Sequence, residues 1–249
     1  MNNNPIISVR NLVASYGEDV ILDRINFEVQ KGEIFAILGG SGCGKSTLLR
    51  HMVGLDEASS GQVAVGGIDI NACSEKEFQT TLRRIGVLFQ SSALLGSMTL
   101  AENIALPIAE HSTLTKRAID NLVRLKLNMV ELSGYGDYLP SEISGGMKKR
   151  AGLARALALN PEILFLDEPS AGLDPVISTE IDVLIKNINQ NIGTTMVIIT
   201  HELDSVFNIA ERIIMLDKDA KGIIAEGDPR FLRDHSEEQR VRQFFNPQF

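Results

Sequence analysis

The 249-residue sequence predicts an α/β fold, and three patterns along the chain support that prediction. Apolar and polar residues alternate within residues 6–33, which is typical of half-buried strands. Residues 34–38 form an unbroken apolar run, as expected for a strand that is buried on both faces. After residue 160, short apolar runs alternate with stretches of helical periodicity, as in the core of an α/β domain.

The first ninety residues are expected to form strands and two helices. A glycine-rich loop follows the apolar run, and the helix after it continues until Gly54. Ser74 and Glu77 form a capping box, which predicts the start of a second helix. The elements expected here are strands within 6–38, a helix over 45–53, a strand pair within 61–72, a helix after Ser74 and a strand over 86–89.

The periodicity becomes helical from about residue 91 to residue 160. Thr99 and Glu102 form a second capping box, and apolar residues between 119 and 130 recur with helical spacing. We therefore expect a helical subdomain inserted into the α/β core. The elements expected after it are a strand over 163–167, a helix over 176–192, a strand over 196–200, a helix over 202–210, a strand over 212–217 and a last helix from Asp228.

Composition excludes several classes of function. Hydrophobic residues make up 44% of the chain and charged residues 22%, which is ordinary for a globular protein, and the net charge of −8 argues against nucleic acid as the main partner. The two cysteines, Cys43 and Cys73, match no zinc-binding spacing and are expected to be reduced cytoplasmic thiols. The sequence has neither a signal-peptide pattern nor an apolar run of about 20 residues, so membrane contact is expected only through a partner.

A phosphate-binding loop lies between the apolar strand and the helix that follows it. Glycines let successive backbone N–H groups point at phosphate oxygens, and the helix N-terminus adds partial positive charge. Lys45 is predicted to act catalytically on the β- and γ-phosphates, Ser46 to bind Mg²⁺, and Thr47 to bond near the α-phosphate. The residues assigned to nucleotide binding here are Gly39, Gly40, Ser41, Gly42, Cys43, Gly44, Lys45, Ser46 and Thr47.

Polar side chains also follow three of the other expected strands. Asp167 and Glu168 end one of them, where unpaired buried charge would be unfavourable, so we predict Asp167 as a Mg²⁺ ligand and Glu168 as the general base. Gln90 is predicted to bind Mg²⁺ and to sense the nucleotide. His201 is predicted to contact the γ-phosphate as a further catalytic residue. All four lie at carboxyl ends of strands, where open α/β sheets bind ligands.

A second anion site is expected at Ser144, Gly145 and Gly146, just before a stretch of helical periodicity. Serine is a favoured helix cap, and the two glycines expose backbone N–H groups at a positive helix end. An ordinary helix start is the alternative. The presence of the phosphate loop upstream and the acidic strand end downstream favours a nucleotide site.

Together these residues resemble the ATP-binding-cassette (ABC) family over nearly the whole chain. The resemblance implies a P-loop ATPase with an antiparallel β subdomain and an inserted helical subdomain, working as a homodimer that encloses two ATP molecules. In that arrangement Ser144, Gly145 and Gly146 of one subunit close on ATP held by the other. Tyr16 is implied to stack on adenine, and residues 171–174 to cross the dimer seam. The alternative for Tyr16 is an ordinary tyrosine at a strand end.

The resemblance also divides the chain into a core over 6–90 and 161–227, a helical signature subdomain over 91–160 and a helical tail over 228–249. Ile143 and Met147 replace the usual leucine and glutamine of the signature. With Met147, the sequence looks like the ATPases of MCE-type (Mla) phospholipid transporters. This implies as partners a membrane permease (MlaE-like), an MCE protein (MlaD-like) and a STAS-domain protein (MlaB-like), and a position on the cytoplasmic side of a Gram-negative inner membrane.

Several alternatives stay open from sequence. The cargo is phospholipid, or another substrate such as a lipoprotein or an amino acid, or the chain is a soluble ABC ATPase outside transport. Leu94 and Leu95 either dock a permease helix or belong to the subdomain core. Phe244 and Phe245 either embrace a second subunit or cover their own core. Cys43, at a helix N-terminus, either has a lowered pKa and reacts with alkylating agents or is an inert loop residue.

Overall fold

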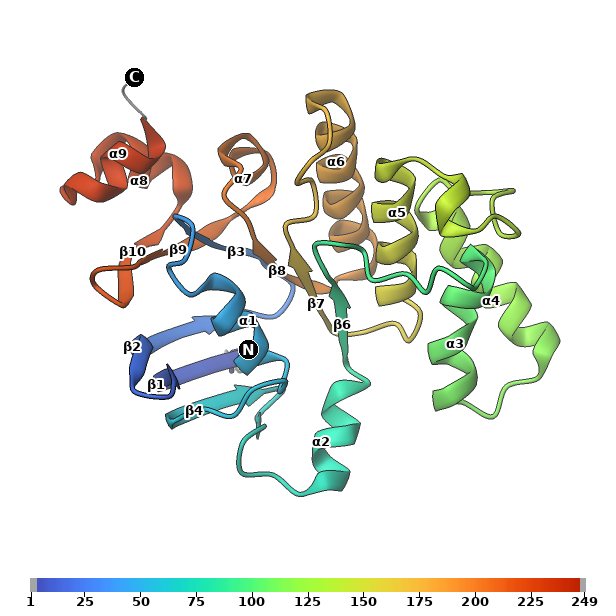
Figure 1. The fold of residues 1–249 in the computed structure, drawn as a ribbon, viewed down its shortest axis with the longest axis horizontal. Helices are drawn as coiled ribbons and strands as arrows, with labels where there is room; N and C mark the ends of the chain where they lie inside the picture. Colours follow the sequence, from blue (N-terminus) through green and yellow to red (C-terminus); the bar gives the residue numbers. More distant parts are fainter. Residues whose placement is uncertain (1–3, 247–249) are drawn as a thin grey trace. The chain divides into compact units, whose positions relative to one another are not determined.

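A computed structural model of the protein describes residues 4–246, which form two compact units. The first unit combines the N-terminal part of the chain up to Leu82 with the C-terminal part from Thr195, and the second spans Arg83–Thr194. Figure 1 shows the elements of both units in sequence colours. The α/β class predicted from sequence is confirmed by the mixed α/β architecture.

An antiparallel sheet in the first unit has the order β2-β1-β4-β5. Alternating burial along β1 places its apolar side chains on one face, as the sequence pattern predicts. The short β5 confirms only part of the strand pair expected within residues 61–72. The strands are β1 (Ile7–Tyr16), β2 (Asp19–Val29), β4 (Ser60–Val65) and β5 (Ile68–Asp69).

The second sheet region of this unit is built around β3 (Ile34–Gly39), whose six residues are all buried. β8 (Thr195–Ile199) and β9 (Arg212–Asp217) pair with β3 in parallel on either side, and β10 (Gly222–Gly227) pairs antiparallel with β9. A strand that is covered on both faces needs apolar residues at every position, which explains the unbroken run. β10 is absent from the sequence-based expectations.

The helices of the first unit are α1 (Lys45–Met52), α2 (Glu75–Leu82), α7 (Leu203–Ile209), α8 (Pro229–His235) and α9 (Gln239–Phe245). The capping box predicted at Ser74 is present, since Glu77 accepts hydrogen bonds from the backbone N–H and hydroxyl of Ser74. The helix expected from Asp228 is confirmed as α8, which Asp228 caps, but a second helix, α9, follows it in the tail. Phe245 of α9 is buried and packs on Phe207 of α7, with ring centroids 5.6 Å apart. The tail therefore covers its own core, and residues 247–249 lie outside the described part.

The second unit contains two parallel strands and four α-helices among its described residues. β6 (Ile85–Leu88) pairs with β7 (Ile163–Asp167) in the register Leu88 to Leu166. The helices are α3 (Leu100–His111), α4 (Lys116–Met129), α5 (Gly145–Ala156) and α6 (Pro175–Ile192), with a 3₁₀ turn at Pro140–Glu142. The capping box predicted at Thr99 is confirmed at the start of α3.

Helix α5 lies at the centre of this unit, between α6 on one side and α3 and α4 on the other (Figure 1). It also packs on β6 so closely that a Cβ at Gly86 would lie 2.2 Å from the carbonyl oxygen of Ala156. A Cβ at Gly152 would lie 2.7 Å from a methyl group of Leu88. Glycine at these two positions lets the helix that follows the signature approach the strand. Within residues 4–246, no helix is both long and apolar enough to cross a membrane.

Candidate functional site

The phosphate loop connects β3 to α1 in the conformation that its glycines predict. Gly42 and Gly44 have positive φ angles of 74° and 99°. A Cβ at Gly44 would lie 2.7 Å from a methyl group of Leu22, so the loop also needs glycine there for space. Gly44 is the N-cap of α1, and within the described chain no side chain caps that helix. The free N–H groups of the first turn are therefore available to an anion.

Lys45 folds back over its own loop. Its ammonium donates to the carbonyl oxygens of Gly39 and Gly40, at 2.7 and 3.0 Å. A phosphate oxygen would compete for these donors with a full negative charge, which makes a stronger hydrogen bond than a neutral carbonyl. The geometry thus agrees with the predicted role of Lys45 in nucleotide binding.

Cys43 is buried, and burial raises the pKa of its thiol despite the nearby Lys45 ammonium. The sequence-based expectation of a lowered pKa is therefore wrong. A helix N-terminus favours the thiolate and so lowers the pKa, but the loss of hydration on burial disfavours the thiolate more strongly. At neutral pH the thiol is protonated and shielded, so the inert loop residue is the alternative that the structure favours.

Tyr16, the residue assigned to adenine, lies at the end of β1 with about half of its surface exposed. Its hydroxyl donates to Asp56 at 2.9 Å, and Asp56 accepts two hydrogen bonds from Arg50 of α1, both 2.8 Å long. The Arg50 guanidinium and the Tyr16 hydroxyl lower the pKa of Asp56 to about 2. This chain of contacts ties the exposed ring to the helix that follows the phosphate loop.

His201 follows β8 and is exposed. The parallel register pairs Ile37 of β3 with Ile199 of β8, so His201 lies two residues beyond its strand at the level of Gly39. The first unit therefore brings the phosphate loop and His201 to the same edge of the same sheet. His51, by contrast, is buried in α1, with its ring bonded to the carbonyl oxygen of Thr47 at 2.8 Å.

In the second unit, Gln90 lies beyond the end of β6, and the acidic pair lies at the end of β7, whose last residue is Asp167. Both strands run in parallel, so their carboxyl ends meet at one edge. Gln90 is exposed, Asp167 is half-buried, and Glu168 is 8% exposed. Glu168 has a positive φ of 48°, which is rare for a residue with a side chain. Strained backbone of this kind is common at catalytic sites.

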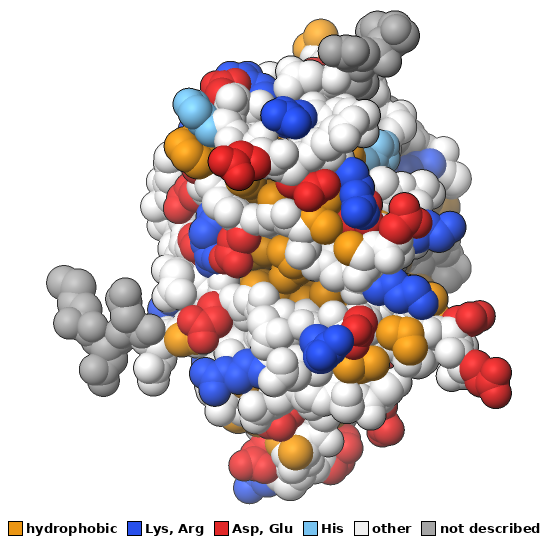
Figure 2. Space-filling model, turned by 90° about the vertical axis from the view of Figure 1, so that its left-hand side faces the viewer, with side chains coloured by type: hydrophobic (Ala, Val, Ile, Leu, Met, Phe, Trp, Pro, Cys, Tyr) orange, Lys and Arg blue, Asp and Glu red, His pale blue; other side chains and the backbone are white. Residues whose placement is uncertain are grey.

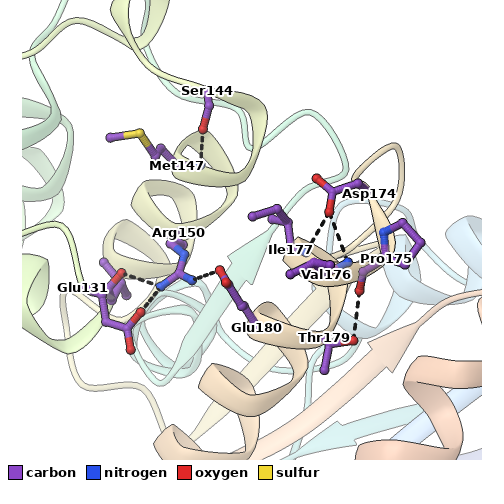
Figure 3. A network of polar contacts seen from close by, with 11 residues as sticks. Glu131, Ser144, Met147, Arg150, Asp174, Pro175, Val176, Ile177, Thr179 and Glu180 are labelled. Atoms are coloured by element: carbon purple, nitrogen blue, oxygen red, sulfur yellow. Dashed lines mark hydrogen bonds and ion pairs between the residues drawn. The ribbon is translucent and has the colours of Figure 1, made fainter.

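The signature residues form the start of α5. The Ser144 hydroxyl accepts a hydrogen bond from the backbone N–H of Met147 at 3.3 Å, as Figure 3 shows. Gly145 is exposed, whereas Gly146 is buried and a Cβ there would lie 2.7 Å from a methyl group of Ile177. Met147 thus contributes its backbone N–H to the cap, which any residue except proline can supply. The cap explains why the replacement of glutamine at this position leaves the helix start intact.

Helix α6 begins next to this helix start. Asp174 caps α6 by accepting from the N–H groups of Val176 and Ile177, both at 3.1 Å (Figure 3). Arg150 of α5 donates to Glu180 of α6 at 2.8 Å and to Glu131, the second residue after α4. Arg150 is largely buried, whereas the side chains of Glu131 and Glu180 are 72% and 49% exposed. The two ion pairs therefore join α5 to α6 and to the segment after α4 at the edge of the solvent.

Three supporting residues, Asp56, Lys149 and Arg150, are absent from the sequence-based expectations. Arg150 lies four residues after Gly146 in a helix with few acidic residues, which is a weak signal of a buried ion pair. Asp56 gives no local signal, because its partners are forty and six residues away in sequence.

The loop between β6 and α3 is anchored by its backbone. Asn103, fully buried in α3, accepts from the N–H of Leu95 at 2.8 Å and donates to its carbonyl at 3.1 Å. The Leu95 side chain is 43% exposed, whereas Leu94 is half-buried. Of the two sequence-based alternatives, Leu95 therefore fits a docking residue better than a core residue.

The residues assigned to Mg²⁺ fit that ion chemically. Ser46, Gln90 and Asp167 offer hydroxyl, amide and carboxylate oxygens, which are the donors that Mg²⁺ prefers. Among the residues that the structure describes, no cluster of three or more His, Cys, Asp or Glu forms a protein-only metal cage. Mg²⁺ commonly binds through few side chains together with substrate phosphates, so this donor set suits it.

The face drawn in Figure 2 carries acidic and basic side chains interspersed around apolar ones, with no continuous basic stretch on that face. A surface that follows a phosphate backbone requires clustered Lys and Arg. Charges of both signs therefore lie close together on this face, in a chain whose net charge is −8.

The family model for ABC transporters matches residues 22–171 of the chain. The chain is 41% identical over 244 residues to the intermembrane phospholipid transport system ATP-binding protein MlaF of Haemophilus influenzae, covering 98% of this chain and 91% of that protein. It is also 41% identical over 240 residues to the probable ribonucleotide transport ATP-binding protein mkl of Mycobacterium leprae, covering 96% and 68%. The methionine import ATP-binding protein MetN of Brucella abortus is 39% identical over 225 residues, with 90% and 60% covered.

Solved structures agree with these relatives. The dimeric cassette MJ0796 with ADP and phosphate, in a post-hydrolysis state, aligns with a TM-score of 0.80 and 30% identity over 89% of this chain and 98% of that one. CbiO1 from Clostridium perfringens, part of the ABC transporter complex cbiONQ, aligns with a TM-score of 0.85 and 29% identity, covering 98% and 96%.

Proposed function

The chain belongs to the ABC transporter family as an ATP-hydrolysing subunit, and we propose that the transporter it powers moves phospholipid between the inner and outer membranes of a Gram-negative envelope. One observation carries the choice of cargo. The chain matches the phospholipid-transport protein MlaF over 98% of its own length and 91% of the relative's length. The matches to mkl and MetN cover 68% and 60% of the lengths of those two proteins.

Cassettes of this family dimerise, as MJ0796 does. We infer that this chain forms a homodimer and that each ATP is bound by the phosphate loop of one subunit and by Ser144, Gly145 and Gly146 of the other. The N–H groups of residues 39–47 and the Lys45 ammonium hold the phosphates, and Tyr16 stacks on adenine. Residues 171–174 would lie along the dimer seam.

The hydrolysis step assigns one role to each polar residue. As the water oxygen bonds to the γ-phosphorus, the Glu168 carboxylate takes a proton from that water, and the bond from the γ-phosphorus to the bridging oxygen of ADP breaks. His201 donates a hydrogen bond to a γ-phosphate oxygen. Ser46, Gln90 and Asp167 would hold Mg²⁺, which supplies charge neutralisation for the phosphate oxygens when bound. ADP and phosphate are the products.

The proposal implies the partners of a phospholipid system: a permease in the membrane, an MCE protein and a STAS-domain protein. The ATPase would lie on the cytoplasmic side of the inner membrane and contact it through the permease. The exposed Leu95, on a loop that Asn103 fixes, is the residue we assign to permease docking.

A second cargo is favoured by a specific relative. MetN is a methionine import protein, so an amino acid is the alternative cargo. Both proposals share the same ATP chemistry, and they differ only in what the permease and its associated proteins bind.

The test is a mild-detergent pull-down of the tagged protein from its native membrane, followed by mass spectrometry of proteins and lipids. We expect a permease, an MCE protein and a STAS-domain protein, together with bound phospholipid. Recovery of a permease with a solute-binding protein for an amino acid, and without phospholipid, would contradict the phospholipid proposal and support the alternative.

A further inference from the structure

Lys149 of α5 connects three functional segments of the second unit. The residue is 6% exposed. Its ammonium donates to the carbonyl oxygen of Gln90 and to the carbonyl oxygen of Glu168, each at 2.7 Å. Distances of this size are typical of hydrogen bonds with a charged donor. One cation on the signature helix therefore contacts the backbone of both residues that we assign to the nucleotide at the ends of β6 and β7.

The register of the strands explains why one side chain reaches both carbonyls. β6 and β7 are paired as far as Leu88 and Leu166, and Gln90 and Glu168 each lie two residues further on. The two residues are thus at the same level, beyond the last pair of the ladder. The ammonium donates a hydrogen bond to one carbonyl oxygen just beyond each strand, and a single nitrogen with three N–H donors is suited to do so.

The backbone of Glu168 adds a reason for such support. Its φ of 48° lies in the left-handed region, where a Cβ is disfavoured by contact with the following backbone. Residues in this region persist where their surroundings hold them in place. The Glu168 carbonyl accepts from Lys149 and also, at 3.3 Å, from the backbone N–H of Ala171. Both bonds act on the peptide unit that immediately follows the strained residue.

Neighbouring side chains of α5 serve different elements. Arg150, the next residue, joins α5 to α6 and to the segment after α4 through Glu180 and Glu131 (Figure 3). Lys149 instead bonds the ends of the two strands. Its side chain is buried and both of these bonds end on backbone carbonyl oxygens, so they depend on the backbone positions of Gln90 and Glu168.

We propose that Lys149 is a positioning residue for ATP hydrolysis: its ammonium holds the backbone of Glu168, and with it Gln90, in a fixed place relative to the signature helix. The inference rests on the proposed role of Glu168 as general base. Lys149 acts through Glu168 and does not touch ATP.

The experiment measures steady-state ATP hydrolysis and ATP binding for Lys149→Met, in the 249-residue protein and in the complex it forms in its native membrane. Methionine keeps the length and the apolar stem but has no donor. We expect kcat to fall about 10- to 100-fold, with the Kd for ATP changed less than about threefold. Lys149→Arg keeps the charge and at least two donors, and should recover most of kcat.

Two controls separate positioning from general damage. Lys148→Met removes the same charge from the neighbouring, half-buried position, and should leave kcat within about twofold of the unchanged protein. The Glu168→Gln background tests the route of action: there, Lys149→Met should cost less than about twofold in the residual rate, because residues acting as a unit are not additive. If Lys149→Met fails to fold, Lys149→Gln, with one amide donor group, takes its place.

The outcomes are distinct. Near-normal kcat in Lys149→Met, or an equal loss in the Glu168→Gln background, or a loss of ATP affinity as large as the loss of kcat, would overturn the positioning role. Near-normal turnover in Glu168→Gln alone would instead refute the assignment of the general base. A low kcat in Lys149→Met, recovered by arginine and not additive with Glu168→Gln, would support the inference.

Discussion

The two helix starts that we assign to ATP, at α1 and at α5, differ in how their N–H groups are satisfied. α1 follows Gly44, and among the described residues no side chain caps it. α5 follows Ser144, whose hydroxyl already accepts from the third N–H of the helix. The phosphate loop is therefore ready for an anion within one chain. The start of α5 is already capped by its own serine. ATP held by a second subunit can contact it only when the exposed Ser144 and Gly145 are brought to that ATP.

The helix starts also differ in their acidic residues. α2 and α3 begin with capping boxes whose acidic residues are Glu77 and Glu102. In the described first turns of α1 and α5 there is no acidic residue, although acids are favourable at that end of a helix. A carboxylate there would repel phosphate, so its absence leaves both starts open to an anion. Helices α4, α6, α8 and α9 lack a first-turn acid as well, so this feature does not by itself identify an anion site.

The largest effect is expected for a variant that still binds ATP but hydrolyses it far more slowly. Glu168→Gln keeps the size of the side chain but removes the base, so we expect kcat for hydrolysis to fall about 10²- to 10⁴-fold. ATP binding should persist, and the dimer enclosing two ATP molecules should become more stable. Turnover assays and size-exclusion chromatography with ATP measure both. Near-normal turnover would show that another group takes the proton.

Lys45→Ala tests the helix start at α1 on its own. Removing the ammonium that donates to the phosphates should weaken ATP binding about 10- to 100-fold, because hydrogen bonds from a charged donor are among the strongest. Equilibrium binding to the isolated subunit measures it. Lys31→Ala, at an exposed turn of the same unit, is the control and should bind as before. Unchanged affinity in Lys45→Ala would refute its phosphate role.

Ser144→Ala tests the helix start at α5. Loss of the cap should lower stability by about 1 kcal/mol, which is a Tm decrease of about 2–4 °C. Because we assign the hydroxyl also to the ATP held by the second subunit, kcat should fall several-fold, whereas ATP binding to the isolated subunit should not change.

The matched control is Thr115→Ala, since Thr115 caps α4 of the same unit with a bond to Ala118. It should lower Tm similarly without lowering kcat. Equal losses of kcat in both variants would mean that Ser144 acts only as a cap.

The smallest expected effect concerns the anchor of Tyr16. Folding lowers the pKa of Asp56 to about 2 from an unfolded-state pKa near 4. The ionised carboxylate therefore stabilises the folded protein fully above about pH 4, and this stabilisation is lost as the pH falls through about 2. Asp56→Asn should lower Tm at pH 7 by no more than about 3 °C, since the ion pair with Arg50 is largely exposed.

The difference in Tm between this variant and the unchanged protein should disappear at pH 2. ATP affinity should fall about two- to threefold, as the ring loses its anchor. Tyr16→Phe, which removes the hydroxyl but keeps the ring, should have the same effect on affinity, and the double variant no more. Additive losses in the double variant would contradict the anchor.

Sequence patterns predicted most of the helices and strands, because these helices and strands depend on local chemistry. The apolar run of β3, the capping boxes of α2 and α3, and β7 are where they were expected. Strand β10 and the second tail helix α9 were missed. Five of the six residues of β10 are half-buried and Glu226 is exposed, so the strand has no alternation of buried and exposed residues. Its pairing with β9 is a tertiary contact that its own sequence does not indicate.

The chain's own sequence determined the fold class through the patterns of apolar residues along the chain. It also determined the phosphate loop and the acidic strand end, because each of these two is a short motif whose chemistry is complete within about ten residues. Only the tertiary structure decided which groups support them: Asp56 behind Tyr16, Lys149 between Gln90 and Glu168, and the raised pKa of Cys43. These depend on burial and on partners distant in sequence. Desolvation and register are properties of packed elements, and no local pattern records them.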